Sequence, residues 1–240
     1  MKSYVRIACL ATLLLGATPT GFADSASSGD APCERIAPAA APTILYQPPH
    51  RGAPARRVGG GTRSIGQLTA LSPPGFGVST RTEPRLYWYL DPGYRNGLRF
   101  LLRPVDGGPP LLEVAVPPQP DGGIRHLHLG EHGVRLEQGR TYEWAVVLEP
   151  EPHQRWPALV SRGLIAVEAP PPALREAALQ ERPFLAARLG IWYDALEDLS
   201  RLMDARGGDR TWRLLRADLL DQGGLRAAAM YERQRTSPRD

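Results

Sequence analysis

The stretch GIWYDAL, Gly190–Leu196, returns 34 residues later in altered form as GLRAAAM, Gly224–Met230. In both copies a glycine is followed by an aliphatic residue and then, four positions further on, by an alanine. A period of 34 residues is typical of repeats that each consist of one helical hairpin. Such a hairpin buries one face against its neighbour and offers another face to a partner. The repeat therefore predicts a helical C-terminal region that serves contact rather than catalysis.

The sequence around this repeat has the 3.6-residue periodicity of amphipathic helices. One stripe of apolar residues ends at Gly207-Gly208 and consists of Ala195, Leu196, Leu199, Leu202 and Met203. A second helix is expected to begin after Asp209, a suitable N-cap, and to end at Gly223. We predict a helical region over residues 170–236. Because two hairpins bury too little surface to be stable alone, we expect them to dock on the preceding domain, with Trp192 and Trp212 as wedges.

Residues 62–169 have a different pattern, in which short runs of period two are divided by proline and glycine. This pattern is typical of a sandwich of antiparallel strands. Tyr142, which begins the clearest alternation, follows Leu136 and Gly139 with the spacing of the tyrosine corner of immunoglobulin-like sandwiches. We therefore expect its phenol to bond the backbone of the preceding turn. The predicted fold class is α+β: an immunoglobulin-like antiparallel β-sandwich followed by C-terminal helical hairpins resembling tetratricopeptide repeats.

The N-terminus has the pattern of an export signal over residues 1–23. Lys2 and Arg6 precede an apolar stretch from residue 7 to residue 17, and a small-x-small site ends at Ala23. The apolar stretch is about half the roughly 20 residues that span a bilayer, so we expect cleavage near Ala23, no stable membrane insertion and a periplasmic or secreted location. Cys33 then remains as the one cysteine. It is either an inert residue or the site of a disulfide to a partner chain or a second copy.

Residues 24–61 are rich in proline, alanine, glycine and serine and have no periodicity. Such a segment buries too little apolar surface to offset its chain entropy, so we predict a flexible leader. The formal net charge of the whole chain is +4, and it falls to +2 without Lys2 and Arg6. This small charge does not indicate a nucleic-acid partner. An arginine group at positions 51, 56, 57 and 63 is either a cationic arm for anionic polymers or a solvated tether.

Three of the five histidines, His126, His128 and His132, lie within seven residues. Three imidazoles suit zinc or copper and would leave one coordination position open. The alternative is a solvated edge strand with Leu127 and Leu129 facing inward. Both interpretations remain open from the sequence.

Aromatic residues alternate in the predicted strand that contains Tyr87, Trp88 and Tyr89. Rings on an open sheet face could stack on sugars, and Trp156 could add an exposed ring from a loop. Alternatively, one face of this strand fills the core and the other packs under the helices. No G-x-S-x-G elbow or H-E-x-x-H motif occurs, and the predicted folded part contains no cysteine to serve as a nucleophile. We therefore expect neither an enzyme nor a cofactor.

Five stretches of the chain carry a resemblance to known proteins: RGAPARRVGGGTR (Arg51–Arg63), LTAL (Leu68–Leu71), LYWYL (Leu86–Leu90), LEQGRTYEW (Leu136–Trp144) and GIWYDAL (Gly190–Leu196). Together they resemble a known bacterial family, the domain of unknown function 928. The resemblance covers roughly residues 48–222 and implies an exported protein with no assigned activity, catalytic residue or cofactor.

These observations lead to the hypothesis of a non-enzymatic exported accessory protein whose partner is an envelope or exported protein. The groove between the hairpins, near Trp192, Tyr193 and Trp212, is where we expect an extended peptide. An alternative is a carbohydrate or cell-wall binding module that uses the rings of the sandwich and takes polysaccharide as its partner. A more remote alternative is a metal-dependent enzyme that uses the histidines.

Overall fold

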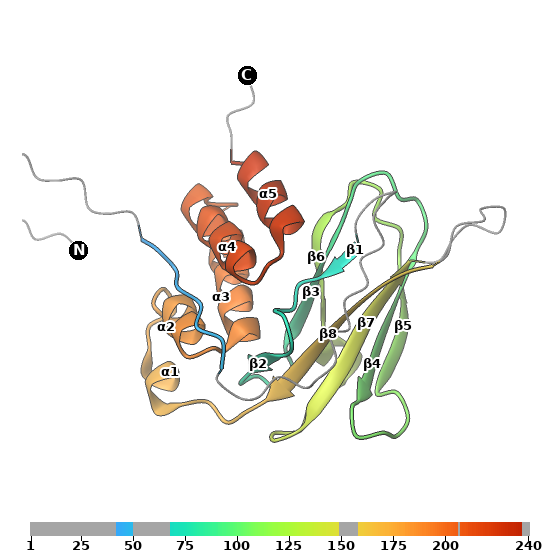
Figure 1. Cartoon of the computed structure of the whole chain (residues 1–240), viewed down its shortest axis with the longest axis horizontal. Coiled ribbons are helices and arrows are strands. Elements are labelled where there is room, and N and C mark those ends of the chain that lie inside the picture. Colours follow the sequence, from blue (N-terminus) through green and yellow to red (C-terminus); the bar gives the residue numbers. More distant parts are fainter. Residues whose placement is uncertain (1–41, 50–67, 149–157, 206, 237–240) are drawn as a thin grey trace, which may run out of the picture. The chain divides into compact units, whose positions relative to one another are not determined.

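Eight strands form two sheets that lie face to face in the computed structural model, which describes residues 42–49, 68–148, 158–205 and 207–236 (Figure 1). The three-stranded sheet has the order β1-β3-β6, with bounds Leu68–Ala70, Arg85–Leu90 and Gly123–His128. The five-stranded sheet has the order β2-β8-β7-β4-β5, with bounds Gly77–Ser79, Leu159–Val167, Thr141–Leu148, Leu98–Pro104 and Leu112–Val116. A short 3-10 helix, η1 (Leu129–His132), follows β6.

The space between the sheets is filled by alternate residues of their strands, as the period-two pattern predicts. Trp88 of β3 reaches Phe100 of β4, with ring centroids 6.3 Å apart, and Phe100 stacks on Trp144 of β7 at 6.0 Å. These three side chains are completely buried. Tyr142, at the start of β7, accepts a hydrogen bond from the backbone N–H of Glu137 at 3.0 Å. The predicted contact between this phenol and the preceding turn is thus confirmed.

One strand pair departs from the predicted antiparallel pattern. β2 runs parallel to β8, with Gly77 opposite Ile165 and Ser79 opposite Val167. The chain crosses from the three-stranded sheet to the edge of the five-stranded sheet between Ala70 and Gly77, and it continues there in the direction of β8. A strand of three residues is too short to show a periodicity, so the sequence could not reveal this pairing.

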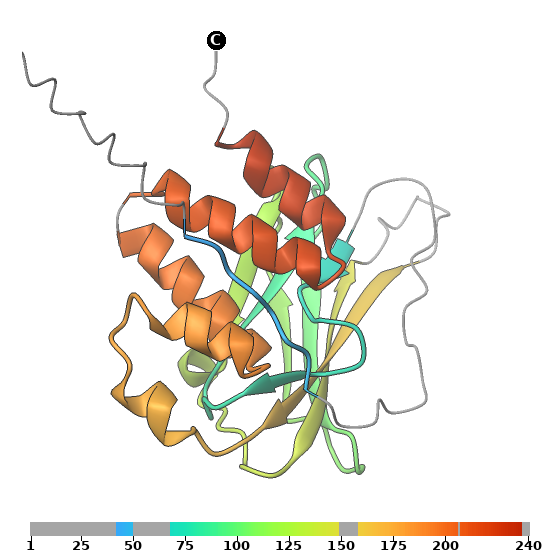
Figure 2. The ribbon, with the colours of Figure 1, turned by 60° about the vertical axis from the view of Figure 1, so that its left-hand side comes forward.

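Five helices follow the strands and form a third layer (Figures 1 and 2). Their bounds are Pro172–Glu176 for α1, Arg182–Arg188 for α2, Trp192–Ala205 for α3, Arg210–Gln222 for α4 and Arg226–Gln234 for α5. Asp209 caps α4 as expected, because its carboxylate accepts a hydrogen bond from the N–H of Thr211 at 2.7 Å. The chain is thus a mixed α+β protein in which a sandwich is followed by helices.

The turns between α2 and α3 and between α4 and α5 have equivalent hydrogen bonds 34 residues apart. The N–H of Ile191 donates to the carbonyl of Ala186 at 2.8 Å, and that of Leu225 donates to Leu220 at 2.9 Å. The glycines that precede these two donors, at positions 190 and 224, both have φ of 75°. This left-handed conformation closes a helix C-terminus with little strain only when the residue has no Cβ.

The helices cover the outer face of the three-stranded sheet, α3 also contacts β2 at the edge of the five-stranded sheet, and the helices share one apolar core with the sandwich. Trp192 takes part as predicted: its indole N–H donates to the carbonyl of Leu71 at 2.9 Å. The ring of Trp212 lies 6.2 Å from that of Phe184, so it packs α4 on α2.

The predicted signal, residues 1–23, lies outside the described residues, and so does Cys33. None of the helices in the described part of the chain combines the length and the apolar character needed to cross a membrane.

Candidate functional site

An extended segment, residues 42–49, lies along the helices (Figure 2). In sequence it is separated from the next described residue, Leu68, by residues 50–67. Two of its side chains are buried, Ile44 at 5% exposure and Tyr46 at 7%, whereas Leu45 between them is 56% exposed. These residues belong to the stretch that the sequence predicted as a flexible leader, so that prediction is wrong for this part of it. The average composition of residues 24–61 does not indicate that Ile44 and Tyr46 are apolar side chains two positions apart, the spacing that puts both on one side of an extended chain. We call residues 42–49 the strap.

Gln222, the last residue of α4, holds the backbone of the strap on both sides of Leu45. Its amide nitrogen donates to the carbonyl of Ile44 at 3.0 Å, and its amide oxygen accepts from the N–H of Tyr46 at 2.8 Å. One carboxamide therefore satisfies a donor and an acceptor of the strap, as a neighbouring strand would do. These bonds involve only backbone groups of the strap, so they do not depend on its side chains.

The turn between α2 and α3 supplies the next contacts. The N–H of Gln47 donates to the carbonyl of Ala187 at 3.1 Å. The chain passes so close to Gly190 that a Cβ there would lie 2.8 Å from the carbonyl oxygen of Gln47 and 3.1 Å from the ring of Pro49. Glycine is thus required at this position both for the left-handed turn and for the approach of the strap.

We call the surface that the strap covers, formed by Ala187, Gly190, Trp192 and Gln222, the groove, and its floor is aromatic. The ring of Tyr46 lies edge-on to that of Trp192, with centroids 4.9 Å apart and planes at 72°. Burial raises the pKa of the Tyr46 phenol to about 12. Its hydroxyl has no hydrogen-bond partner among the described residues, so the groove accepts the ring rather than the hydroxyl.

A pocket of about 460 Å³ opens beside the N-terminal half of the strap. It is lined by Thr43, Ile44, Asp218, Asp221, Gln222, Arg226 and Arg233. Arg233 pairs with both aspartates, at 3.0 Å to Asp218 and 3.1 Å to Asp221. The groove therefore continues as an open pocket with charged side chains beside the buried side chain of Ile44.

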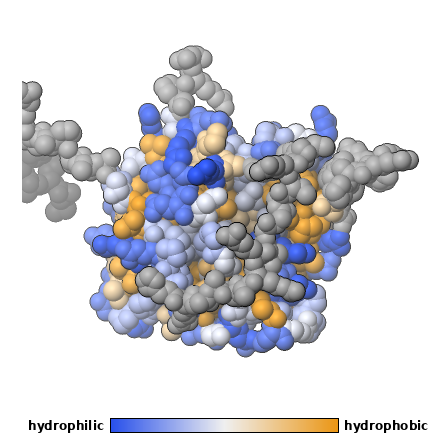
Figure 3. All heavy atoms as spheres, in the orientation of Figure 1, coloured by the Kyte–Doolittle hydropathy of each residue, from blue (hydrophilic) through white to orange (hydrophobic). Residues whose placement is uncertain are grey.

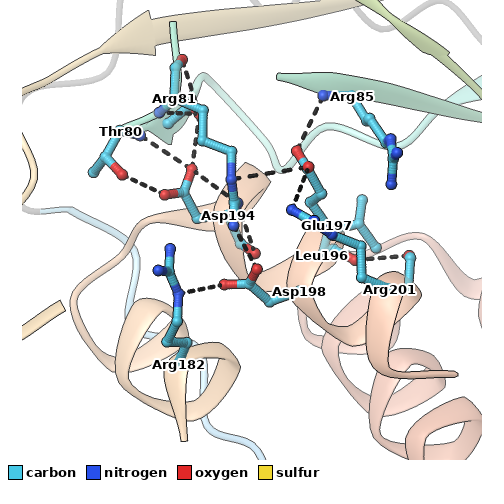
Figure 4. A network of polar contacts seen from close by, with 11 residues as sticks. Thr80, Arg81, Arg85, Arg182, Asp194, Leu196, Glu197, Asp198 and Arg201 are labelled. Atoms are coloured by element: carbon cyan, nitrogen blue, oxygen red, sulfur yellow. Dashed lines mark hydrogen bonds and ion pairs between the residues drawn. The ribbon is translucent and has the colours of Figure 1, made fainter. Parts of the chain in front are cut away.

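A second cluster consists of three buried carboxylates on one side of α3: Asp194, Glu197 and Asp198 (Figure 4). Asp194 accepts hydrogen bonds from the hydroxyl of Ser79 at 2.8 Å and from the N–H and hydroxyl of Thr80. Glu197 accepts from the N–H of Arg85 at 3.1 Å. All of these donors belong to the end of β2 or to the start of β3, so the carboxylates join α3 to the sandwich.

Arg81 is the common cation of this cluster. Its guanidinium bonds Asp198 directly and lies 3.7 Å from Asp194 and 3.8 Å from Glu197. Arg182 of α2 adds a bond to Asp198 at 3.2 Å. Burial alone would lower the pKa of the Arg81 guanidinium, but the three carboxylates outweigh it and raise the pKa. These paired carboxylates therefore hold the helical layer against the sandwich.

The three residues that the sequence proposed for partner contact, Trp192, Tyr193 and Trp212, are all buried, with exposures of 0%, 1% and 8%. Tyr193 lies in the core between α3 and the five-stranded sheet. Its hydroxyl accepts from the indole N–H of Trp144 at 2.9 Å and donates to the carbonyl of Leu164 at 3.0 Å. Tyr193 and Trp212 are therefore not the lining of an open groove. Trp192 lies beneath the strap, where its ring packs against that of Tyr46.

The three histidines are not brought together. His126 lies opposite Tyr87 with ring centroids 5.1 Å apart, His128 lies 3.5 Å from the carboxylate of Glu131, and His132 follows in η1. No group of three or more potential ligand side chains is placed to hold a metal ion in the part of the chain that the structure describes. β6 is the edge of its sheet, and Leu127 and Leu129 are buried. The interpretation as an edge strand with inward leucines is thus confirmed.

The rings of β3 are not available to sugars. Tyr87 and Tyr89 are 3% and 6% exposed, and Tyr89 packs against Tyr231 of α5 with ring centroids 5.4 Å apart. One face of β3 fills the sandwich and the other packs under the helices, which confirms the second interpretation of this strand and contradicts the alternative of an open aromatic face. The remaining candidates, Trp156 and the arginines at positions 51, 56, 57 and 63, lie outside the described residues.

Large apolar side chains that do reach the surface are scattered over several elements: Leu45, Val105, Leu111, Val160, Leu179, Leu189 and Met230. On the face drawn in Figure 3 the orange residues form separate patches among blue ones. Leu45 stands out because it projects from the strap, beside the groove.

A family model described as "Domain of Unknown Function (DUF928)" matches residues 51–232. No curated protein matches the chain. The matched range contains the walls of the groove, whereas the strap precedes it.

Proposed function

We propose, from the premise that the chain belongs to the DUF928 family, that it is a non-enzymatic accessory protein of the bacterial envelope that binds an extended segment of an exported protein. The observation that carries this proposal is the pair of hydrogen bonds from Gln222 to the strap, because it is a way of holding any extended chain. A groove of this kind requires no catalytic group and no cofactor.

The two halves of the fold fit such a role. The contact between Tyr142 and Glu137 supports a likeness of the sandwich to immunoglobulin-like domains. The equivalent turns at Gly190 and Gly224 support a likeness of the helical hairpins to tetratricopeptide repeats. In this proposal the sandwich is a rigid support, and α2, α3 and α4 present the groove.

Export is the second part of the proposal, and it rests on the signal pattern that ends at Ala23. Expression in a Gram-negative host should give a periplasmic or secreted protein whose N-terminal residue is Asp24. Recovery of the full chain from the cytoplasm would contradict this part.

Binding is tested with the purified chain and a matched pair of variants. Gln222→Ala removes the carboxamide that holds the strap, and Gln234→Ala removes an exposed glutamine from the end of α5. Each protein is immobilised and challenged with an envelope extract of its own organism. The proposal expects a protein that is retained by the wild type and by Gln234→Ala but lost with Gln222→Ala. Equal retention by all three, or retention of nothing specific, would contradict it.

A further inference from the structure

We infer that the strap is an exchangeable occupant of the groove: a segment of a partner protein with an aliphatic residue two positions before an aromatic one, followed by prolines, binds in its place. This inference rests on the proposed function and names the chemistry of the partner. The strap itself shows what the groove recognises, because the sequence of residues 43–49 is TILYQPP.

The side chains of the strap that enter the groove can be separated from those that stay exposed. Ile44 and Tyr46 enter the groove, and the close approach at Gly190 fits the prolines that end the strap. Leu45 and Gln47 are exposed, although the N–H of Gln47 is bonded. A partner segment therefore needs an aliphatic and an aromatic side chain with one free position between them, and it needs an extended backbone.

The strap can leave without dismantling the rest of the structure. Its described hydrogen bonds number three, two with Gln222 and one with Ala187. The bonds that close the two helical turns, and those that join α3 to the sandwich, involve other residues. The family match begins at residue 51, so the walls of the groove belong to the family domain and the strap does not.

Covalent connection gives the strap an advantage over a free peptide. A tethered segment behaves as if it were present at a high local concentration, of millimolar order for short flexible linkers. A partner segment then binds with an apparent affinity that is reduced by the fraction of molecules whose groove is vacant. The strap thereby sets the affinity or the concentration that a partner segment needs. Only a segment that binds the groove more tightly than the strap, or that is present at high concentration, displaces it.

The test uses the purified chain and a fluorescein-labelled peptide with the sequence of residues 42–49. The variant Ile44→Ala/Tyr46→Ala removes both anchors of the strap and leaves every wall residue in place. Leu45→Ala is its matched control, since it changes the exposed side chain between them. Fluorescence anisotropy should show the double variant binding the peptide at least about tenfold more tightly than the wild type, with Leu45→Ala like the wild type.

A second pair of changes shows that the peptide occupies this groove. Added to the double variant, Gly190→Ala should abolish peptide binding because its Cβ fills the space of the strap backbone, whereas Gly224→Ala meets nothing within 4 Å and should not. If the double variant does not fold, as judged by its near-ultraviolet circular dichroism, hydrogen exchange of the wild type replaces it. There, millimolar unlabelled peptide should raise the exchange rate of the Tyr46 amide.

Three results would overturn the inference: a folded double variant that does not bind the peptide, equal binding with Gly190→Ala and Gly224→Ala, or an exchange rate that excess peptide does not change. Failure of the proposed function has a different signature. If the peptide binds the vacated groove but no envelope protein depends on Gln222, the groove is exchangeable and the proposed function is wrong. If an envelope protein binds but peptide does not, the partner uses another surface.

Discussion

Single side chains connect parts of this molecule that are far apart in sequence. Gln222 bonds Tyr46 across 176 positions, and Tyr193 bonds Trp144 across 49. Tyr142, by contrast, bonds a residue only five positions away. This difference decides what the sequence could reveal. The spacing of Leu136, Gly139 and Tyr142 predicted a local contact, whereas nothing near Gln222 indicates which distant backbone its carboxamide will hold.

Removal of the Tyr142 hydroxyl tests the local contact. Tyr142→Phe leaves the N–H of Glu137 without its acceptor, and we expect the free energy of unfolding to fall by about 1 kcal/mol. Urea denaturation measures the change. The control is Tyr231→Phe, whose hydroxyl accepts from Arg235 at the surface and whose loss should change stability by less than about 0.5 kcal/mol. Equal losses from the two variants would contradict a structural role of the phenol.

Unlike Tyr142→Phe, the change Tyr46→Phe should not lower the free energy of unfolding. The hydroxyl is buried without a partner among the described residues, so its removal should leave the protein equally stable or more stable at pH 7. The unfolded chain loses the Tyr46 proton near pH 10, but the folded chain loses it only at about 12. The ionisation of Tyr46 therefore leaves the free energy of unfolding unchanged below pH 10 and lowers it as the pH rises from 10 to 12.

The difference in stability between wild type and Tyr46→Phe in this pH range reports the ionisation of Tyr46 alone. Other buried tyrosines, such as Tyr87, are present in both proteins and contribute equally. Thermal melting at pH 7, 10 and 11 should show the wild type falling behind the variant as the pH increases. Parallel loss of stability in the two proteins would show that the Tyr46 ring is not buried in the groove.

At the scale of elements, the two glycine turns are equal in backbone geometry but not in surroundings. Both have φ of 75°, yet a Cβ at position 190 would meet the strap at 2.8 Å while one at position 224 meets nothing within 4 Å. Gly224→Ala should cost about 1–2 kcal/mol, the penalty of a left-handed residue. Gly190→Ala should cost about 1–3 kcal/mol more, since the strap must move. Denaturation curves of the two variants give the comparison, and equal costs would place the strap elsewhere.

The helical turns and the long strands could be predicted because their patterns extend over many residues. Gly190 and Gly224 marked both helical turns, and the alternation from Tyr142 to Leu148 marked β7. Two features could not be deduced in this way. β2 has only three residues, and α3 is buried nearly all round, so that its acidic side faces Arg81 rather than water.

In the whole molecule, Arg81 and the carboxylates of α3 join the helical layer to the sandwich. Arg81→Met removes the common cation and leaves buried carboxylates with fewer partners. We expect the free energy of unfolding to fall by about 3–5 kcal/mol. Arg99→Met breaks a pair with Glu113 that is nearly half exposed on both sides, and it should cost at most about 1 kcal/mol. Similar losses from the two variants would mean that the layers are held mainly by their apolar contacts.

The arrangement of the two sheets and the helical layer could be predicted only in part from the sequence. Docking of the helices on the sandwich follows from the small surface that two hairpins bury, and Trp192 was identified as one of its contacts. Which sheet receives the helices could not be deduced, because Tyr87 and Tyr89 would have been equally suited to an open face. The strap was hidden in a proline-rich leader, and its partner Gln222 lies at the other end of the chain.

Hydrogen exchange at the backbone amides of Tyr46 and Gln47, followed by NMR, tests most directly whether the groove holds an extended chain. The two amides bond Gln222 and Ala187, so they should exchange far more slowly than amides of an unstructured peptide, and Gln222→Ala should speed the exchange of Tyr46. Exchange of both amides at the rate of a free peptide in the wild type would contradict the account.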